Sequence, residues 1–274
     1  MKQFVRLFLV LSMAAIFSAG SATAADYKLN VGIQTWTLRN LDFDGVVKFA
    51  KEHGLTQLQM ISKHIDPHGD WDEIKRRKAI LDKEGLTCYT IGVSGTSMEK
   101  EKNRRLFEFA KFMGCKLIIV EPKDFAIFDN LEELVKEFDI RIAIHNHGLT
   151  SLYGNPLVVK NVIQHRDERI GVCLDAGWVT AAGFDAGKVF RDYNGRVFDI
   201  HLKDKKIEKT KVGRDVYLDV LVGTGDANFK SLFKELKKAN WDGVLAIETD
   251  NKGYAAMPHE CVKTAIEYVK ANHP

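Results

Sequence analysis

Eight short apolar runs recur along the chain, and they constrain its fold more than any other feature of the sequence. They cover residues 29–33, 57–61, 87–91, 116–120, 140–144, 170–174, 197–200 and 244–247. Segments with apolar residues at three- and four-residue spacing lie between them, among them 43–52, 71–84, 99–113, 131–138, 156–164 and 229–239. Short strands that alternate with helices predict a parallel sheet, and eight such units predict a barrel.

Glycines at the ends of the predicted helices support the same repeat. Gly54, Gly85 and Gly114 each follow a helical segment and lead into the next apolar run, where a left-handed C-cap is expected. A doubly wound open sheet is the alternative fold, but no G-x-G-x-x-G motif follows an early strand, so its nucleotide-binding form loses its main support. We therefore predict an α/β fold with a single (β/α)8 TIM barrel and no second domain.

The first 25 residues have the pattern of a secretory signal peptide. Lys2 and Arg6 precede an uncharged apolar stretch, 7–17, and small residues then suit cleavage after Ala24 or Ala25. An uncleaved anchor is the weaker alternative, because the apolar stretch is shorter than the ~20 residues of a membrane span. This pattern predicts that the protein is exported to the periplasm. The predicted signal peptide covers 1–25 and the predicted barrel domain covers 26–274. No membrane contact is expected after cleavage.

The net charge and the cysteine spacing bear on which partners and which disulfides are expected. Cleavage removes two basic and no acidic residues, so the formal charge falls from +3 to +1. This near-neutral surface gives no reason to expect nucleic acid as a partner. Cys88, Cys115, Cys173 and Cys261 lack the spacing of a disulfide framework. Cys88 and Cys173 are expected in the core, a bridge from Cys88 to Cys115 stays open, and no oligomeric state is predicted.

Four of the apolar runs are followed directly by a side chain that binds metals. His145, Asp175, His201 and Glu248 follow the fifth, sixth, seventh and eighth runs. A single Asp or Glu after a strand is more often a helix cap or a loop residue. However, the strand C-termini of a barrel converge on one face, so four such residues favour one divalent metal site. Two imidazoles and two carboxylates suit Mn, Co, Fe or Zn better than Mg or Ca.

Strand periodicity places further side chains on the same face, because residues two apart point the same way. His147 and Lys203 lie two residues beyond the histidines of the fifth and seventh runs. Lys203 is a candidate to hold an oxyanion or, with a depressed pKa beside a metal, to act as a base. The alternative is a surface lysine paired with Asp204. Asn146 is expected to brace its loop.

Other candidates follow the first, second and fourth runs. Glu121 is expected to bind sugar hydroxyls or take a proton, with a turn residue as the alternative. His64 and Trp36 are expected in the pocket wall, although Trp36 is equally suited to cap the core. The glycine-rich loop 223–226 precedes the predicted helix 229–239, where phosphate can bind. Asp226 is instead expected to be the N-cap of that helix and to repel phosphate.

These motifs resemble a known family. The segments I-H-N-H-G (144–148), L-D-A-G (174–177), H-L-K-D (201–204), G-V-L-A-I-E (243–248) and G-I-Q-T-W-T-L-R (32–39) carry the likeness. They are similar to the sugar phosphate isomerase/epimerase group of xylose isomerase-like TIM barrels, which includes inosose dehydratases. The resemblance covers essentially the whole chain after the leader. It implies the metal ligands His145, Asp175, His201 and Glu248, and it says little about the substrate.

Two positions depart from the family pattern. Many relatives carry on strand five a glutamate that doubles as a proton-transfer base, where this chain has His145. A two-glutamate epimerase mechanism is therefore not carried over. A histidine is common three residues after the strand-six aspartate, where this chain has Trp178. We count Trp178 with Glu121, His64 and Trp36 as positions that contact the substrate.

Chemistry and resemblance together imply removal of a proton next to the carbonyl of a keto-sugar. A divalent metal would stabilise the enediolate, with Glu248 or His147 as base and Lys203 at the oxyanion. Return of the proton gives an isomerase or epimerase, which is the primary interpretation. Loss of a β-substituent gives a keto-sugar or 3-keto-glycoside lyase or hydratase. Export favours an unphosphorylated sugar, since phosphorylated sugars are mainly cytoplasmic.

Two interpretations from other classes stay open. The first is phosphodiester hydrolysis, as in the endonuclease IV branch of this barrel, which needs more histidines and a DNA-binding surface. The near-neutral charge argues against it. The second is a sugar-binding barrel without catalysis, in which the chemistry was lost at His145 and Trp178.

Overall fold

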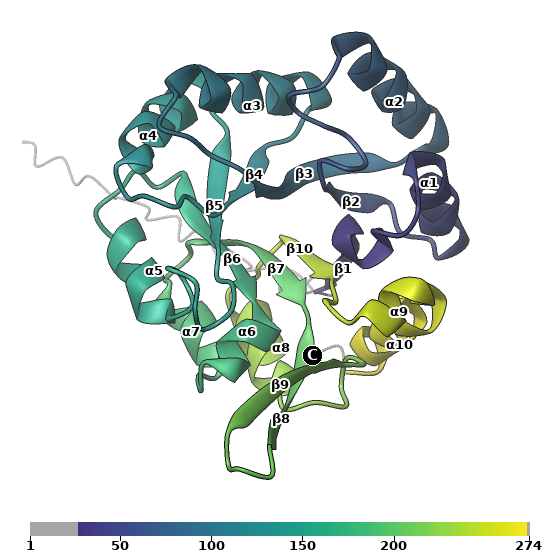
Figure 1. The fold of residues 1–274 in the computed structure, drawn as a ribbon, viewed down its shortest axis with the longest axis vertical. Coiled ribbons are helices and arrows are strands. Elements are labelled where there is room, and N and C mark those ends of the chain that lie inside the picture. Colours follow the sequence, from purple (N-terminus) through teal and green to yellow (C-terminus); the bar gives the residue numbers. More distant parts are fainter. Residues whose placement is uncertain (1–26, 273–274) are drawn as a thin grey trace, which may run out of the picture.

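Eight parallel strands close into a barrel in the computed structural model, which describes residues 27–272 (Figure 1). Their order around the barrel is β1-β10-β7-β6-β5-β4-β3-β2. The strands are β1 (Asn30–Gln34), β2 (Gln57–Met60), β3 (Thr87–Ser94), β4 (Leu117–Val120), β5 (Arg141–His145), β6 (Ile170–Asp175), β7 (Val197–Leu202) and β10 (Val244–Ile247). The predicted (β/α)8 TIM barrel is thus confirmed, whereas the signal peptide predicted for 1–25 lies outside the described residues.

Helices surround the barrel, and every predicted amphipathic segment forms one (Figure 1). They are α1 (Phe43–Glu52), α2 (Trp71–Glu84), α3 (Lys100–Met113), α4 (Ile127–Phe138), α5 (Pro156–Ile163), α6 (Ala176–Ala181), α7 (Ala186–Asp192), α8 (Phe229–Lys238), α9 (Lys252–Ala256) and α10 (Pro258–Ala271), with a short 3-10 helix at Thr35–Leu38. Gly85 and Gly114 are left-handed C-caps with φ of 69° and 82°, as predicted. No helix among residues 27–272 is long and apolar enough to cross a membrane.

The strands are buried on both faces, as expected for a parallel sheet covered by helices. All residues of β4, β6 and β10 are buried. The strand register then sets the heights of the residues at the strand ends. Asp175 at the end of β6 is paired with His201 of β7, and His201 is paired with Ala246 of β10. This alignment brings side chains from separate βα units to the same level of the barrel.

The four cysteines are buried free thiols. Cys88 of β3 and Cys173 of β6 belong to the core, as predicted. The Sγ atoms of Cys88 and Cys115 are 3.8 Å apart, and the Cys115 thiol donates to the Cys88 carbonyl at 3.0 Å. Cys115, which lies just before β4, is thus next to Cys88 of β3, and no disulfide joins them.

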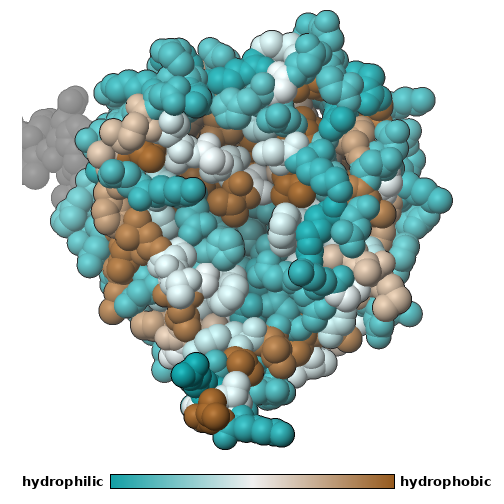
Figure 2. Space-filling model, viewed as in Figure 1, coloured by the Kyte–Doolittle hydropathy of each residue, from teal (hydrophilic) through white to brown (hydrophobic). Residues whose placement is uncertain are grey.

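An antiparallel hairpin interrupts the βα repeat after β7. It consists of β8 (Asp204–Lys209) and β9 (Asp215–Val220), and it projects from one edge of the barrel (Figure 1). Figure 2 shows a mostly hydrophilic face, with hydrophobic atoms at the end of this projection. Val212, in the turn of the hairpin, is 79% exposed. The hairpin was not among the predicted elements, because the charged residues of β8 resemble a solvated loop.

The prediction that Asp226 is the N-cap of the following helix is wrong. Asn228 is the N-cap of α8, and its side chain accepts a hydrogen bond from the Ser231 amide at 3.1 Å. Asp226 instead accepts from the Ile207 amide at 2.8 Å and from the Lys206 ammonium at 2.5 Å. It therefore fastens the loop to β8 rather than starting the helix.

The amides of the same glycine-rich loop surround a carboxylate of the protein itself. Asp204 accepts hydrogen bonds from the amides of Gly223 at 2.9 Å, Gly225 at 2.8 Å and Ala227 at 3.1 Å. A carboxylate held in this way already occupies the donors that a phosphate would need. The loop is accordingly an internal turn whose amides bind Asp204.

Candidate metal and substrate site

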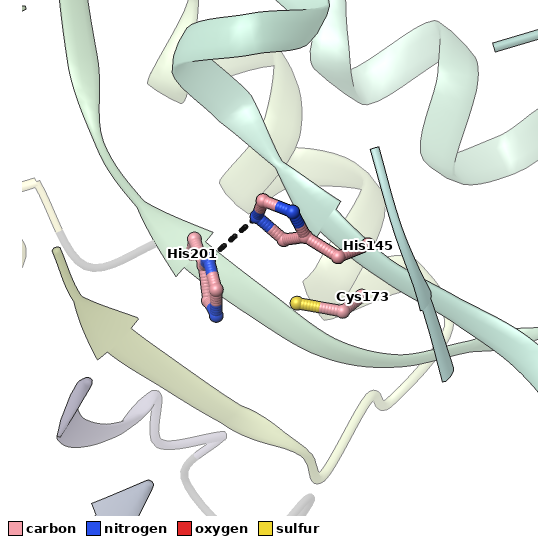
Figure 3. Close-up of side chains that lie close together, drawn as sticks. All are labelled: His145, Cys173 and His201. Carbon is pink, nitrogen blue, oxygen red and sulfur yellow. Dashed lines mark hydrogen bonds between the residues drawn. The ribbon is translucent and has the colours of Figure 1, made fainter. Parts of the chain in front are cut away.

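The four predicted metal ligands meet at the C-terminal end of the barrel. Suitable donor atoms of His145, Asp175, His201 and Glu248 all lie within 4.8 Å of one another. The His145 Nε2 atom is 3.0 Å from His201 Nδ1 (Figure 3) and 3.5 Å from Asp175 Oδ2. The His201 Nδ1 atom is 2.7 Å from Glu248 Oε2 and 3.8 Å from Asp175 Oδ2. All four side chains are buried.

This cluster fits a divalent metal. Four tetrahedral ligand atoms about 2.1 Å from an ion are separated by about 3.4 Å, close to the separations found among these donors. Asp175 Oδ2 and Glu248 Oε2 are buried without a hydrogen bond of good geometry, and the ammonium near them, that of Lys203, lies 3.1 and 3.0 Å away and is shared by both. Buried carboxylate oxygens without hydrogen bonds are costly unless a cation balances them. The donor set, two imidazoles and two carboxylates, matches Zn, Fe, Co or Mn.

Local structure explains how these side chains are aimed. Asp175 is the N-cap of α6, and its Oδ1 accepts from the Trp178 amide at 2.9 Å, which leaves Oδ2 for the cluster. Asn146 braces this turn, as predicted, because its side chain bonds the amide and the carbonyl of Asp175 at 2.9 and 3.3 Å. Gln59 of β2 lies 3.0 Å from the His201 Nε2 atom and orients that ring.

Lys203 lies among the carboxylates of the cluster. Its Nζ atom is 3.1 Å from Asp175 Oδ2, 3.0 Å from Glu248 Oε2 and 2.9 Å from Asp250 Oδ2. Burial lowers the pKa of Lys203, but these carboxylates outweigh it and raise the pKa well above its ordinary value. Lys203 is therefore not the surface lysine paired with Asp204, and the depressed pKa considered for a lysine base is not found. It is a buried ammonium.

A second polar layer lies beneath the two imidazoles. Cys173, from β6, points toward them (Figure 3), and its thiol donates to Asp199 Oδ2 at 3.4 Å. The hydroxyl of Tyr89 donates to the other oxygen of Asp199 at 2.8 Å. Burial raises the pKa values of both Cys173 and Asp199. Cys173 thus remains a thiol that packs under the cluster, although its sulfur is near both histidines.

A cavity of about 380 Å³ opens above the cluster. Its lining includes Trp36, Ser62, Lys63, His147, Glu248 and Asp250. The structure thus brings together Trp36, His147 and the metal cluster, as the sequence predicted. Trp36 is 42% exposed, and its indole N–H donates to Asp250 Oδ1 at 3.1 Å. A fixed, exposed aromatic face of this kind suits a sugar ring.

His147 is oriented by a carboxylate. Its Nδ1 atom is 3.0 Å from Glu121 Oε2, and Ser151 donates to the other Glu121 oxygen at 2.5 Å. The hydrogen bond that His147 donates to the Glu121 carboxylate raises the pKa of His147. Burial alone would raise the pKa of Glu121, but hydrogen bonds from His147 and Ser151 lower it overall. Glu121 therefore acts on the site through His147, whose Nε2 atom is left for the cavity.

The other two predicted contacts lie outside the lining of the cavity. His64 is fully buried, and its Nε2 atom is 3.2 Å from the carbonyl of Leu41. Burial lowers the pKa of His64 to about 4, so the ring is neutral and structural. Trp178 lies behind His147, with 6.1 Å between ring centroids, and the ammonium of Lys205 is 3.6 Å from the centre of its ring.

Sequence reasoning missed the lining residues Ser62, Lys63 and Asp250, and also Gln59 beside His201. Asp250 lies two residues beyond Glu248, so the periodicity that found His147 and Lys203 was a usable signal for it. Gln59 is a polar residue in the middle of the run 57–61 and is buried, and a buried polar residue inside a strand indicates a partner within the barrel.

A comparison with known families agrees with the observed fold. The model of the xylose isomerase-like TIM barrel family matches residues 47–272. The chain belongs to this family. The resemblance inferred from the strand-end motifs is therefore confirmed.

Relatives with known names extend the comparison. An inosose dehydratase of Clostridium perfringens is 25% identical over 240 residues, which cover 73% of this chain and 81% of the relative. A solved structure of an uncharacterised protein from Parabacteroides distasonis has 25% identity and a TM-score of 0.68, covering 90% of this chain and 99% of the other. A structure of an IolI protein with a bound zinc atom has 13% identity and a TM-score of 0.68, covering 88% and 97%, and it shares the fold.

Proposed function

We propose that this protein is a divalent-metal-dependent enzyme that removes a proton next to the carbonyl of a keto-sugar and expels the β-oxygen substituent. The observation that carries the proposal is the placement of His147 on the wall of the same cavity that exposes the cluster. A bound divalent ion would supply a Lewis acid for the carbonyl oxygen and its developing negative charge. His145, Asp175, His201 and Glu248 would hold it.

His147 is the proposed proton-transfer group. Glu121 fixes its Nδ1 atom and so directs Nε2 to the cavity. In the proposed step the Cα–H bond breaks, a carbon–carbon double bond forms and the β-carbon–oxygen bond breaks. Nε2 accepts the proton and returns it to the departing oxygen, which leaves as water or an alcohol. The buried ammonium of Lys203 contributes positive charge near the site, and Trp36 offers a face for the sugar ring.

Elimination fits this cavity better than a two-base reaction. Epimerisation with two bases needs a proton-transfer group on each face of the substrate. At the strand-five position the chain has His145, and burial lowers the pKa of this histidine while its Nε2 faces the cluster. The name of the Clostridium perfringens relative, a dehydratase, agrees with elimination.

Isomerisation or epimerisation is the second candidate. The observation that favours it is that Glu248 lines the same cavity as His147 and could return the proton from another side. The two outcomes share the loss of the proton and differ in whether the substituent leaves. A single experiment therefore distinguishes them.

The test is proton NMR in D2O of the metal-loaded protein with a panel of keto-sugars and 3-keto-glycosides. Elimination predicts a product lighter by water or the alcohol, whereas epimerisation predicts a product of unchanged skeleton that carries deuterium next to the carbonyl. His147→Gln should lose at least 100-fold in rate, in the range of general acid–base catalysis. Glu248→Gln should lose stoichiometric metal.

The matched control is His165→Gln, which changes an exposed histidine on the surface. It should keep both metal and rate. Absence of exchange and of product with every substrate, despite stoichiometric metal in the wild type, would contradict the proposal and favour hydrolysis or binding alone.

A further inference from the structure

The β8–β9 hairpin contacts the site through one buried carboxylate. Asp219, on β9, has an Oδ2 atom that accepts from the Asp250 amide at 2.5 Å and from the Thr249 hydroxyl at 3.3 Å. Its backbone carbonyl accepts from the Asn251 side chain at 3.1 Å. One hairpin residue thus binds three consecutive residues of the loop that follows β10 and the proposed ligand Glu248.

The other oxygen of the same carboxylate is bonded within the hairpin. Asp219 Oδ1 accepts a hydrogen bond from the ammonium of Lys205, which is on β8 and is 2% exposed in its side chain. That ammonium lies 3.6 Å from the centre of the Trp178 ring, a cation–π contact. Asp219 is therefore connected to Trp178 through Lys205.

Asp250 and Trp178, the two residues that Asp219 connects, both lie near the ammonium of Lys203. Asp250 is 2.9 Å from Lys203 Nζ on one side, and the centre of the Trp178 ring is 5.8 Å from it on another. Asp250 also holds the indole N–H of Trp36, the exposed aromatic residue of the cavity. A change at Asp219 would consequently reach Trp36 and Lys203 without touching any of the four metal ligands.

We propose that Asp219 is a positioning residue of the site. It holds Asp250 and, through Lys205, Trp178, so that the hairpin sets the position of the Trp36 wall on which the sugar would lie. The expected effect on sugar binding rests on the proposed function. The contacts by which Asp219 positions Asp250 and Trp178 do not depend on which reaction occurs. The hairpin is then a working part of the substrate site rather than a surface insertion.

The chain offers a matched control for this test. Asp226 also accepts from a backbone amide and a lysine of the hairpin, Ile207 and Lys206, but on the outer side and away from the cavity. Asp219→Ala and Asp226→Ala remove the same kind of interaction. The two variants therefore differ in whether the removed carboxylate faces the site.

The first measurement needs no substrate. Indole N–H resonances of the four tryptophans are recorded by ¹⁵N–¹H NMR of the full mature chain, with Trp36→Phe used to assign Trp36. We expect Asp219→Ala to shift the Trp36 resonance and to speed amide hydrogen exchange in residues 249–251 at least tenfold. Asp226→Ala should leave both unchanged. An unchanged Trp36 resonance together with unchanged exchange in Asp219→Ala would overturn the proposal.

The second measurement uses the substrate found in the D2O experiment. Asp219→Ala should raise KM about tenfold while kcat changes less than threefold, since the wall moves and the proton-transfer groups stay. Equal KM values in the Asp219 and Asp226 variants would assign the hairpin a stabilising role alone and overturn the proposal. If the wild type shows no turnover, the proposed function fails. The NMR result still decides whether Asp219 positions Trp36.

A double variant keeps the test possible if Asp219→Ala does not fold. Removal of Asp219 alone leaves Lys205 buried without a partner. Should Asp219→Ala not fold, Asp219→Leu combined with Lys205→Met removes both charges and the acceptor oxygens while it keeps a side chain in the space. This double variant should fold and still shift the Trp36 resonance, and a wild-type resonance in it would overturn the proposal.

Discussion

A buried lysine surrounded by carboxylates gives the candidate site its electrostatic character. Lys203 touches two of the proposed ligands, Asp175 and Glu248, and also Asp250. In water such contacts contribute little, but inside a protein a charge without its partner is costly. The residue thus serves as a fixed counter-charge for side chains that otherwise repel one another.

Lys203→Met tests this role through the dependence of stability on metal. Without metal, the variant leaves three carboxylates close together, so we expect the free energy of unfolding to fall by about 3 kcal/mol. With saturating zinc the loss should be clearly smaller, because the ion replaces the missing charge. Urea unfolding with chelator and with zinc measures both values.

The exposed Lys206 gives the control for that experiment. Lys206→Met should change the free energy of unfolding by less than about 0.5 kcal/mol in either condition, as is usual for a surface residue. A loss in Lys203→Met that is equal with and without zinc would show that Lys203 packs against the site without balancing its charge.

His64 predicts a specific dependence of stability on pH. Burial lowers its pKa from 6.5 to about 4, so between these values the unfolded chain takes a proton that the folded chain refuses. The free energy of unfolding should therefore fall as the pH drops through this window, by about 2 kcal/mol between pH 7 and pH 5. His64→Gln removes the titration and should flatten this part of the profile.

The comparison for His64 is the exposed histidine His165. Urea unfolding of His165→Gln should give the pH profile of the wild type. If His64→Gln kept the full slope between pH 7 and pH 5, another group would be responsible for it.

At the scale of elements, α8 shows that a helix can be predicted from the correct first residue and still be assigned the wrong N-cap. The cap is Asn228, whereas Asp226 bonds β8. We expect Asn228→Ala to lower the free energy of unfolding by about 1 kcal/mol, the usual effect of losing an N-cap. Asp226→Ala should cost less than about 0.5 kcal/mol, because its ion pair is exposed. Thermal or urea unfolding of both variants measures the difference, and the reverse order would make Asp226 the cap.

The strand ends were predictable because their information is local. An apolar run fixes the strand, the strand fixes its C-terminal face, and His145, Asp175 and His201 then meet through the barrel register. No distant contact has to be known for this step. The same reasoning with a spacing of two residues found His147 and Lys203.

The hairpin was not predictable by the same reasoning. β8 carries charges on both faces, so it lacks the apolar alternation of a half-buried strand, and its pairing with β9 could not be predicted from it. β9 does alternate, with Val216, Leu218 and Val220 on one face, but this signal alone does not indicate its antiparallel partner. Their importance comes from Asp219, which meets Asp250 across 31 positions of sequence. Likewise, the turn of His64 toward Leu41 is set by packing. Contacts of this kind depend on the completed fold.

At the scale of the whole molecule, the family and the barrel are shown, while export is a prediction that concerns residues outside the described part. We expect the chain, expressed with its leader in a Gram-negative host, to be recovered from the periplasm without residues 1–24 or 1–25. Intact-mass spectrometry of that fraction checks the cleavage point. A full-length mass, or recovery from the cytoplasm alone, would contradict export.

The charges around Lys203 have a consequence for the ion that the barrel accepts. Asp175, Glu248 and Asp250 share a single ammonium, so the group as a whole carries two uncompensated negative charges. An ion of charge two makes it neutral, whereas a monovalent or trivalent ion leaves a residual charge in a buried place. We therefore expect the protein to discriminate ions by valence more sharply than by element. The supply of divalent metals in its surroundings would then decide which one it carries.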